Sequence, residues 1–197
     1  MSGASGVAYG IRLLELLRDT AVETHLVMTK AAEMTLACET DIKPDQVRAL
    51  ADVNYGINEV GAGPASGSFR SLGMVVAPCS IRSMSEIVSG VTSNLLTRAA
   101  DVMLKERRRL VLMVRETPLH AGHLRSMTRL AELGAIIAPP VPAFYPRPQS
   151  IDDIVNHSAG RVLDLFDIDV GAVVRWREDR STRPALEPVA IESSRAR

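Results

Sequence analysis

Four residues with chemically useful side chains directly follow short apolar runs of the chain. They are Thr29, Ser80, Arg115 and Glu116. Hydroxyl and guanidinium groups can bind an anion, and a carboxylate can transfer a proton. Because ligands of open parallel sheets bind beyond the carboxyl ends of the strands, we expect these side chains to meet at one site.

A turn of small residues opens the first expected helix. Gly3, Ala4, Ser5 and Gly6 lie just before an apolar pattern of helical spacing. Glycines let the backbone approach a ligand, and a helix N-terminus offers free N–H groups and the positive end of the helix dipole. The turn matches neither GxGxxG nor the P-loop pattern, so it favours a mononucleotide phosphate. Ordinary helix initiation is the alternative, since small-residue turns before helices are common.

Further polar residues fit either a ligand or a plain surface. Ser66 lies in a hydroxyl-rich stretch that is also normal turn chemistry. Arg98 and Lys105 lie two turns apart on one helix face, which is either solvated or presents a cationic pair to a phosphate. Glu116, beside Arg115, is either a surface ion pair or, near apolar walls, an acid or base with a raised pKa.

The composition restricts the classes of function. Lys and Arg number 23, as do Asp and Glu, so no basic field exists to bind a nucleic acid or an anionic membrane. No apolar run reaches the roughly 20 residues of a membrane span, and no signal peptide opens the sequence. His120 and His123 share a helical face, which we interpret as polar surface rather than a metal site. With only two cysteines, a reducing cytoplasm is the expected location.

Short β-rich runs alternate with helical patterns along the chain. The expected strands are 22–28, 72–77, 110–114 and 135–138, with Pro78 ending the second. The expected helices are 7–17, 31–38, 45–50, 81–88, 95–107, 120–133 and 151–166, and residues 54–71 are expected to be a loop. This alternation predicts a single α/β domain whose mostly parallel sheet is covered by helices on both faces.

The beginning and end of the chain depart from that pattern. A doubly wound sheet normally feeds its first phosphate-binding turn from a central strand, yet none precedes Gly3. Either the sheet is short by one strand, or a short apolar strand lies upstream of Met1. We expect the second, because without that strand its neighbours would lack hydrogen-bonding partners. Beyond Trp176 the sequence is polar and Arg-rich, which predicts a domain of residues 1–177 and a flexible tail of residues 178–197.

Six ordered motifs resemble those of the UbiX-type flavin prenyltransferases, also called small subunits of aromatic acid decarboxylases. The motifs are 2–6 (SGASG), 66–68 (SGS), 78–80 (PCS), 98–107 (RAADVMLKER), 110–118 (LVLMVRETP) and 142–149 (PAFYPRPQ). The resemblance extends over about residues 1–177, nearly the whole chain. It implies a Rossmann-like, flavodoxin-like domain of three α/β/α layers.

The resemblance also implies roles for individual residues. Reduced flavin mononucleotide (FMN) would contact Gly3, Ala4, Ser5, Thr29, Ser80, Ile81, Arg82, Ser83 and Arg115. Dimethylallyl phosphate would contact Tyr145, Arg161, Arg98, Lys105 and Ser66. Glu116 and Glu39 would handle protons, and Ser5 and Lys105 would assist them.

The implied reaction prenylates the flavin itself. N5 of reduced FMN attacks the dimethylallyl group, phosphate departs, and ring closure at C6 releases a proton, which we assign to Glu116. Arginine and lysine offset the charge of the departing phosphate, so no metal is needed. Prenylated FMN would serve a UbiD-type decarboxylase. The family also implies a homo-oligomer, a dodecamer with flavin sites at subunit contacts.

Two other functions fit the same fold. FMN-dependent cysteine decarboxylases characteristically use a histidine near the flavin and a Pro-x-Met-Asn segment, and neither pattern occurs where expected. A non-catalytic flavin carrier, or accessory subunit of an aromatic acid decarboxylase, would keep the flavin site. Loss of Glu39, Glu116, Tyr145 or Arg161 would favour the carrier, and all four are present.

Overall fold

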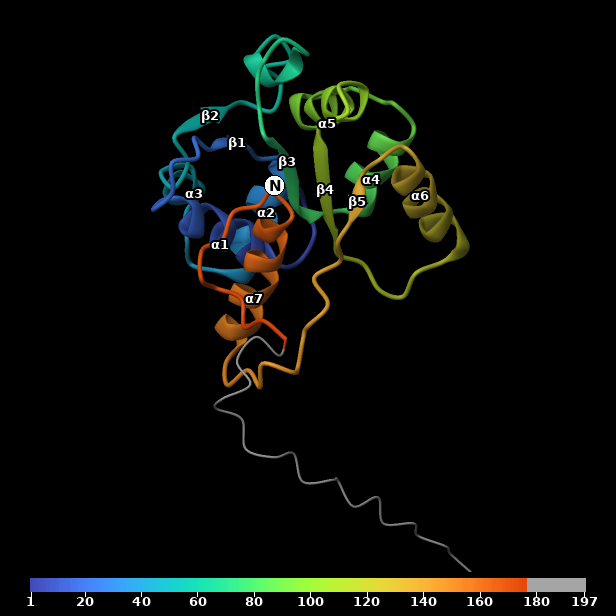
Figure 1. Cartoon of the computed structure of the whole chain (residues 1–197). Helices are drawn as coiled ribbons and strands as arrows, with labels where there is room; N and C mark the ends of the chain where they lie inside the picture. Colours follow the sequence, from blue (N-terminus) through green and yellow to red (C-terminus); the bar gives the residue numbers. More distant parts are fainter. Residues whose placement is uncertain (177–197) are drawn as a thin grey trace, which may run out of the picture.

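The computed structural model describes residues 1–176, in which parallel strands are flanked by helices on both faces (Figure 1). In chain order the elements are α1 (Val7–Leu17), β1 (His25–Val27), α2 (Lys30–Glu39), α3 (Pro44–Arg48), β2 (Val53–Tyr55), the 3-10 turn η1 (Gly63–Ala65), β3 (Gly73–Cys79), α4 (Ile81–Val88), α5 (Leu95–Lys105), β4 (Arg109–Val114), α6 (Ala121–Glu132), β5 (Ile136–Ile137) and α7 (Ile151–Asp164). The predicted tail, residues 178–197, lies outside the described residues.

The strands form two parallel groups, β1–β2 and β3–β4–β5. Met1 and Ser2 lie between the groups. The Met1 amino group donates to the Val27 carbonyl at 2.7 Å, and the Thr29 amide donates to the Met1 carbonyl at 3.2 Å. On the other side, the Ser2 amide donates to the Pro78 carbonyl at 3.2 Å. Two residues therefore connect the groups where the sequence analysis expected a central strand; the upstream strand itself stays a prediction.

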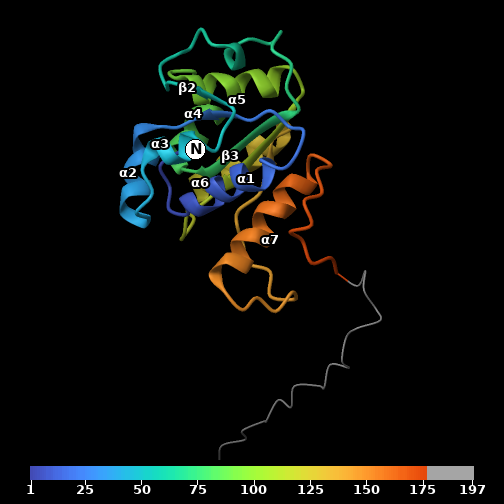
Figure 2. The same cartoon turned by 90° about the vertical axis from the view of Figure 1, so that its left-hand side faces the viewer.

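The three-layer arrangement follows from alternation along the central strand β4. Leu110, Leu112 and Val114 pack against α4, α5 and α6 on one face of the sheet. Val111 and Met113 point to the other face and pack against α1 and α7. Successive side chains of a strand point to opposite faces, so an uninterrupted apolar run must be covered on both sides. Figure 2 shows α1 and α7 together on one side of the strands. The predicted α/β/α class is confirmed.

Two predictions in the middle of the chain are wrong. The expected loop 54–71 contains most of β2, which pairs in register with β1, and the turn η1. Strand β2 has only three residues, too few for a clear alternating pattern in the sequence. It is recognised as a strand by its pairing with β1. Strand β3 does not stop before Pro78 but continues to Cys79, with a register shift between Val76 and Cys79. The irregularity accommodates a residue that has no N–H to donate to the ladder.

Smaller differences concern the ends of elements. β1 is shorter than the predicted 22–28, and α5 and α7 end before the predicted residues 107 and 166. Helix α6 begins after His120, whose Nδ1 accepts from the amides of Gly122 and His123 at 3.0 and 3.4 Å. His120 is thus a helix cap, and its ring stacks on that of His123 at 3.6 Å.

Candidate functional site

A buried serine, Ser2, connects the segments that form the predicted site at the strand ends. Ser2 donates its hydroxyl to the Pro78 carbonyl at 2.9 Å and accepts from the Ser80 amide at 2.8 Å. These bonds attach the small-residue turn to the end of β3. The Arg115 amide donates to the Cys79 carbonyl at 3.1 Å, which attaches the end of β4 to the same point. Ser2 is a residue for which the sequence alone predicted no separate role, although its place at the start of the motif 2–6 was a signal.

Two helices begin beside this junction. Thr29 caps α2 by accepting from the Ala32 amide at 3.0 Å, and Ser80 caps α4 by accepting from the Ser83 amide at 3.2 Å. Both caps have extended backbones, which is usual for an N-cap residue. The predicted cofactor residues therefore mark two helix N-termini at one edge of the sheet, where the helix dipoles favour an anion.

The turn before α1 depends on its glycines. Gly6 has φ of +96°, a left-handed conformation that glycine adopts without steric cost. A Cβ added to Gly3 would lie 2.9 Å from the carbonyl carbon of Ala31, so only glycine lets the turn lie against the start of α2. We call residues 2–6, Thr29, residues 80–83 and Arg115 the strand-end cradle.

Glu39 occupies the N-terminus of α1. Its carboxylate accepts from the Gly6 amide at 2.9 Å and the Val7 amide at 3.0 Å, and thereby caps a helix that has no side-chain cap of its own. Burial opposes ionisation, but these bonds, a hydrogen bond from Ser5 and attraction to Arg115 hold the pKa of the Glu39 carboxyl below its usual value. Because Glu39 uses the Gly6 and Val7 amides, a phosphate would bind at the start of the turn and at α2 and α4.

Glu116 lies next to the cradle on a more open surface. It follows Arg115 directly after β4, and both side chains are exposed. The Glu116 carboxylate accepts from the Thr117 amide at 3.0 Å. Among the hydrogen bonds of the described residues, Glu116 thus has one local donor whereas Glu39 has several. The two predicted proton-handling carboxylates therefore lie in different surroundings.

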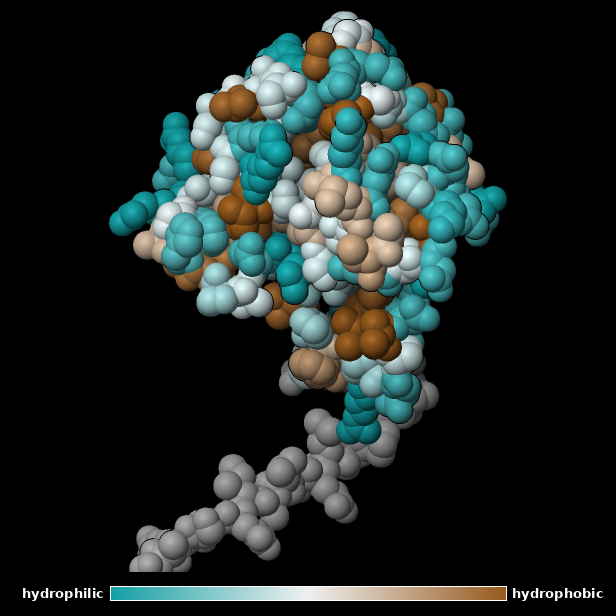
Figure 3. Space-filling view, turned by 180° about the vertical axis from the view of Figure 1, so that it is seen from behind, coloured by the Kyte–Doolittle hydropathy of each residue, from teal (hydrophilic) through white to brown (hydrophobic). Residues whose placement is uncertain are grey.

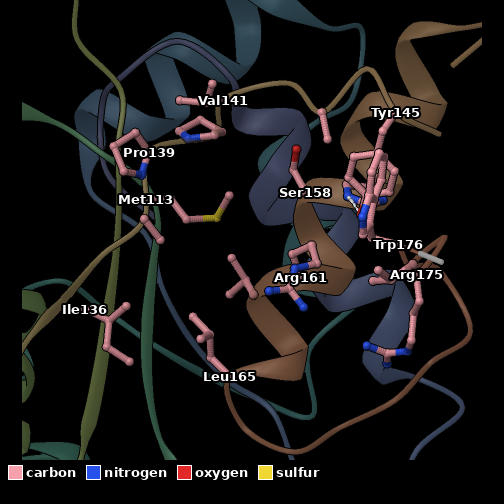
Figure 4. A pocket seen from close by; sticks show the side chains of 16 residues that line it. Met113, Ile136, Pro139, Val141, Tyr145, Ser158, Arg161, Leu165, Arg175 and Trp176 are labelled. Carbon is pink, nitrogen blue, oxygen red and sulfur yellow. Dashed lines mark hydrogen bonds between the residues drawn. The ribbon is translucent and has the colours of Figure 1, made fainter. Parts of the chain in front are cut away.

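A second candidate region is a pocket of about 750 Å³ between the sheet and α7 (Figure 4). We call it the α7 pocket. Its apolar walls include Met113, Ile136 and Val141, and its polar side chains include Tyr145 and Arg161. The sequence resemblance predicted the last two as substrate residues, and the structure brings both to this pocket.

The hydroxyl of Tyr145 and the guanidinium groups of Arg161 and Arg175 already have partners in the α7 pocket. The Tyr145 hydroxyl lies 2.9 Å from the Val174 carbonyl oxygen and 3.3 Å from Nε2 of His157. Arg161 donates to Asp164 at 2.6 Å. Arg175 donates to both carboxylate oxygens of Asp164, at 3.1 and 3.0 Å. Burial raises the pKa of Asp164, but the two guanidinium groups outweigh burial and keep it low. Arg175 also donates to Asp169 at 3.1 Å, so the two cations face two carboxylates. The Arg161 side chain is still 54% exposed, which leaves it accessible to an incoming anion.

The remaining predicted substrate residues lie elsewhere. Arg98 and Lys105 are on α5, and Ser66 follows η1, which packs on α5. Arg98 donates to the Ala65 carbonyl at 3.1 Å and to Asp101 at 2.7 Å, while Lys105 pairs with Glu106. Figures 1 and 2 both show α5 and η1 at the top of the molecule and α7 toward the bottom. We call Arg98, Lys105 and Ser66 the α5 face. Within a single chain the α5 face does not reach the α7 pocket.

The rest of the described surface offers no stronger site. Within residues 1–176 there is no cluster of three or more His, Cys, Asp or Glu residues that could hold a metal ion. No helix in that part of the chain is long and apolar enough to cross a membrane. Burial raises the pKa of the Cys79 thiol to about 12, so it is a poor nucleophile. Figure 3 shows hydrophobic side chains in separate small areas, interrupted by hydrophilic ones, on the face it displays.

Comparisons with known proteins agree with this geometry. The flavoprotein family model matches residues 1–163. The flavin prenyltransferase UbiX of Escherichia coli K12 is 59% identical over 180 residues, which are 90% of this chain and 95% of that protein. The structure of AnUbiX (PadA1) in complex with FMN and dimethylallyl pyrophosphate has a TM-score of 0.88 at 55% identity and covers 89% of this chain and 94% of its own.

A further solved structure bears on assembly. The dodecameric FMN-dependent UbiX-like decarboxylase from Escherichia coli O157:H7 has a TM-score of 0.87 at 44% identity. The match covers 90% of this chain and all of the other. Sequence identity this high over almost the full length, together with the same fold, establishes the family. The chain belongs to the flavoproteins and, among them, to the UbiX flavin prenyltransferases.

Proposed function

We propose that this chain transfers a dimethylallyl group from dimethylallyl phosphate to N5 and C6 of reduced FMN and so makes prenylated FMN. The observation that carries the proposal is the convergence of Ser2, Thr29, Ser80 and Arg115 at one edge of the sheet. Reduced FMN, the acceptor substrate, would supply the nucleophilic nitrogen. The residues of the chain bind it, orient it and handle the proton.

The strand-end cradle fits FMN in its donor chemistry. Two helix N-termini, capped by Thr29 and Ser80, provide backbone N–H groups for one phosphate. Arg115 adds a guanidinium, which can bind an anionic oxygen through two parallel hydrogen bonds. The turn at residues 3–6 lacks the dinucleotide fingerprint GxGxxG, which supports a mononucleotide.

The donor phosphate would bind at Tyr145 and Arg161, with Arg98, Lys105 and Ser66 supplied by another copy of the chain. The α5 face and the α7 pocket lie toward opposite ends of one molecule, so a single chain cannot use both on one phosphate. We therefore propose a homo-oligomer, a dodecamer like that of the UbiX-like neighbour, with the donor site at subunit contacts. Positive charge from two copies would stabilise the departing phosphate without a metal.

Proton removal during ring closure is assigned to Glu116. Burial raises the pKa of Glu39, but several hydrogen bonds and the attraction of Arg115 outweigh burial and lower it, so Glu39 binds a proton poorly. Glu116 accepts from a single backbone amide and is open to solvent in the isolated chain. A bound flavin and a neighbouring subunit would bury it, and burial raises the basicity of a carboxylate. Glu39 and Ser5 would support the same proton transfer from the turn.

The product and the location belong to the same proposal. Prenylated FMN would be passed to a UbiD-type decarboxylase. Cys38 and Cys79 are both free thiols, which supports a reducing cytoplasm as the location.

One experiment tests the function directly. The protein is incubated without oxygen with reduced FMN and dimethylallyl phosphate, and the flavin is then analysed by mass and by absorbance. We expect one added C5 unit in a closed ring. Dimethylallyl diphosphate in a parallel reaction distinguishes the donor, and flavin adenine dinucleotide distinguishes the acceptor. Unmodified flavin in every reaction would disprove the proposal, and equal binding of the dinucleotide would disprove the mononucleotide site.

A further inference from the structure

A buried histidine lies behind the proposed substrate tyrosine. His157 on α7 has only 8% of its surface exposed. Its Nε2 lies 3.3 Å from the Tyr145 hydroxyl, and the two rings meet edge to face with centroids 5.4 Å apart. Trp176 packs on Tyr145 in the same way at 5.2 Å. The phenol belongs to an irregular segment between β5 and α7, so these contacts from other segments hold it in place.

The hydrogen bonds determine which nitrogen of His157 carries the proton. The Tyr145 hydroxyl has one proton, and the Val174 carbonyl at 2.9 Å can only accept it. The contact between the phenol oxygen and Nε2 then requires N–H on Nε2. Nδ1 is buried without a hydrogen-bond partner in the described residues. The opposite tautomer would bury an unpaired N–H there, which proteins tolerate less well than an unpaired acceptor.

We propose that His157 is a positioning residue that holds the phenol oxygen of Tyr145 through Nε2–H, so that the hydroxyl proton can turn from the Val174 carbonyl to a phosphate oxygen. The inference rests on the proposed role of Tyr145 and deepens it. The phenol oxygen accepts a hydrogen bond from His157 and donates its own proton to the Val174 carbonyl. When dimethylallyl phosphate binds, a phosphate oxygen would replace that carbonyl as the acceptor. His157 keeps the oxygen in place during that exchange.

Helix α7 also determines how Tyr145 and Arg161, the two residues proposed to bind the phosphate, lie relative to each other. His157 lies one helical turn before Arg161, so both are on the same face of α7. Through His157 the helix positions Tyr145, and through Arg161 it presents a guanidinium to the same pocket (Figure 4). Burial and the nearby Arg161 lower the pKa of His157, with Asp164 acting in the opposite direction. A neutral imidazole therefore donates the hydrogen bond without adding charge.

Steady-state kinetics with dimethylallyl phosphate test the proposal. His157→Leu removes the N–H group that binds the phenol oxygen. KM for dimethylallyl phosphate should rise roughly five- to tenfold, the usual effect of one lost hydrogen bond. The FMN affinity should stay the same. His157→Gln places an amide N–H near the position of Nε2 and should recover most of the loss. Ser158→Ala is the matched control, because Ser158 lines the same pocket while its hydroxyl donates to Ile154.

A double-mutant cycle separates positioning from packing. In a Tyr145→Phe background, His157→Leu should change KM little, because the phenol oxygen is already absent. Equal impairment by His157→Leu in both backgrounds, or equal impairment by the Gln and Leu variants, would overturn the proposal. If Tyr145→Phe itself leaves KM unchanged, the proposed role of Tyr145 is wrong instead.

A spectroscopic measurement is independent of activity, and its main result needs only the wild-type protein. Nitrogen-15 NMR of the histidine side chains in wild-type protein should show His157 protonated on Nε2, and Tyr145→Phe should shift that resonance. A proton on Nδ1 would contradict the assignment, whatever the kinetics show.

Discussion

The strand-end cradle and the α7 pocket are built in opposite ways. In the cradle, the groups available to a ligand are mainly backbone amides and short hydroxyls. Buried Ser2 connects the turn to the end of β3 by hydrogen bonds. In the pocket, long side chains reach out from a helix and an irregular segment, and Arg161 is already paired with Asp164. The predicted cofactor residues of the first arrangement already meet within one chain. The second presents the partly exposed Arg161 to a ligand and lacks the cations of the α5 face.

This difference matches the proposed ligands. A rigid cradle suits a flavin that must be held in one orientation, because preorganised donors need no rearrangement on binding. Flexible cations with local acidic partners suit a small phosphate that arrives, reacts and leaves. We therefore expect FMN binding to survive changes in the pocket, whereas binding of dimethylallyl phosphate should depend on contacts between subunits.

The largest effect is expected from removing the proposed base, which should slow ring closure without changing ligand binding. Glu116→Gln keeps the shape of the side chain but removes the base. We expect the rate of closed-product formation to fall by about 10²- to 10⁴-fold, the usual contribution of general-base catalysis. Flavin attached only at N5 should accumulate, as measured by mass and absorbance. If closed product forms at the wild-type rate, the base is another residue, and Glu39 is the next choice.

Removing one pocket cation should weaken the donor but not the flavin. Arg161→Ala loses a charged hydrogen bond, so KM for dimethylallyl phosphate should rise about ten- to a hundredfold. The FMN dissociation constant, measured by fluorescence, should not change. Arg129→Ala is the matched control, because Arg129 has the same spacing to an acidic partner, Glu132, on α6. A parallel loss of FMN affinity would show that the two regions are not separate.

Mixing two defective chains tests whether the pocket is completed by a neighbour. Arg98→Ala and Arg161→Ala change residues of the α5 face and the α7 pocket, respectively. Co-expressed in one oligomer, they should recover a measurable fraction of activity, because some sites then receive both wild-type residues from different copies. Arg161→Ala combined with Tyr145→Phe changes one pocket twice and should not recover. Full activity of a monomer, identified by light scattering, would contradict the shared site.

The smallest expected effect concerns the carboxylate that caps α1. The lowered pKa of Glu39 means that its charge stabilises the folded state above the unfolded pKa near 4.5, and that this contribution is lost as pH falls through the folded value. Glu39→Gln should therefore lower Tm modestly at pH 7, and the difference from wild type should shrink in acid. A difference that is constant with pH would mean that the charge contributes nothing.

The sequence was sufficient for the class of the fold and for most residues of the cradle, although not for the junction at Ser2. Apolar runs with helical patterns between them predict parallel strands, and the ends of such strands meet at one edge. Thr29, Ser80 and Arg115 could be assigned to one region for that reason alone. Each lies beside its own strand or helix end, where periodicity within a few residues determines the position. Their contacts with ligand remain predictions.

Contacts between distant segments could not be obtained in this way. Glu39 caps α1 rather than its own helix, and His157 reaches Tyr145 across an irregular segment. Arg98 and Arg161, which belong to the same set of predicted substrate residues, are kept apart by the sheet and its helices. Such contacts depend on how whole elements pack, and packing is set by the side chains of several elements at once. Periodicity describes one element at a time, so it carries no information about which residue of another element lies opposite.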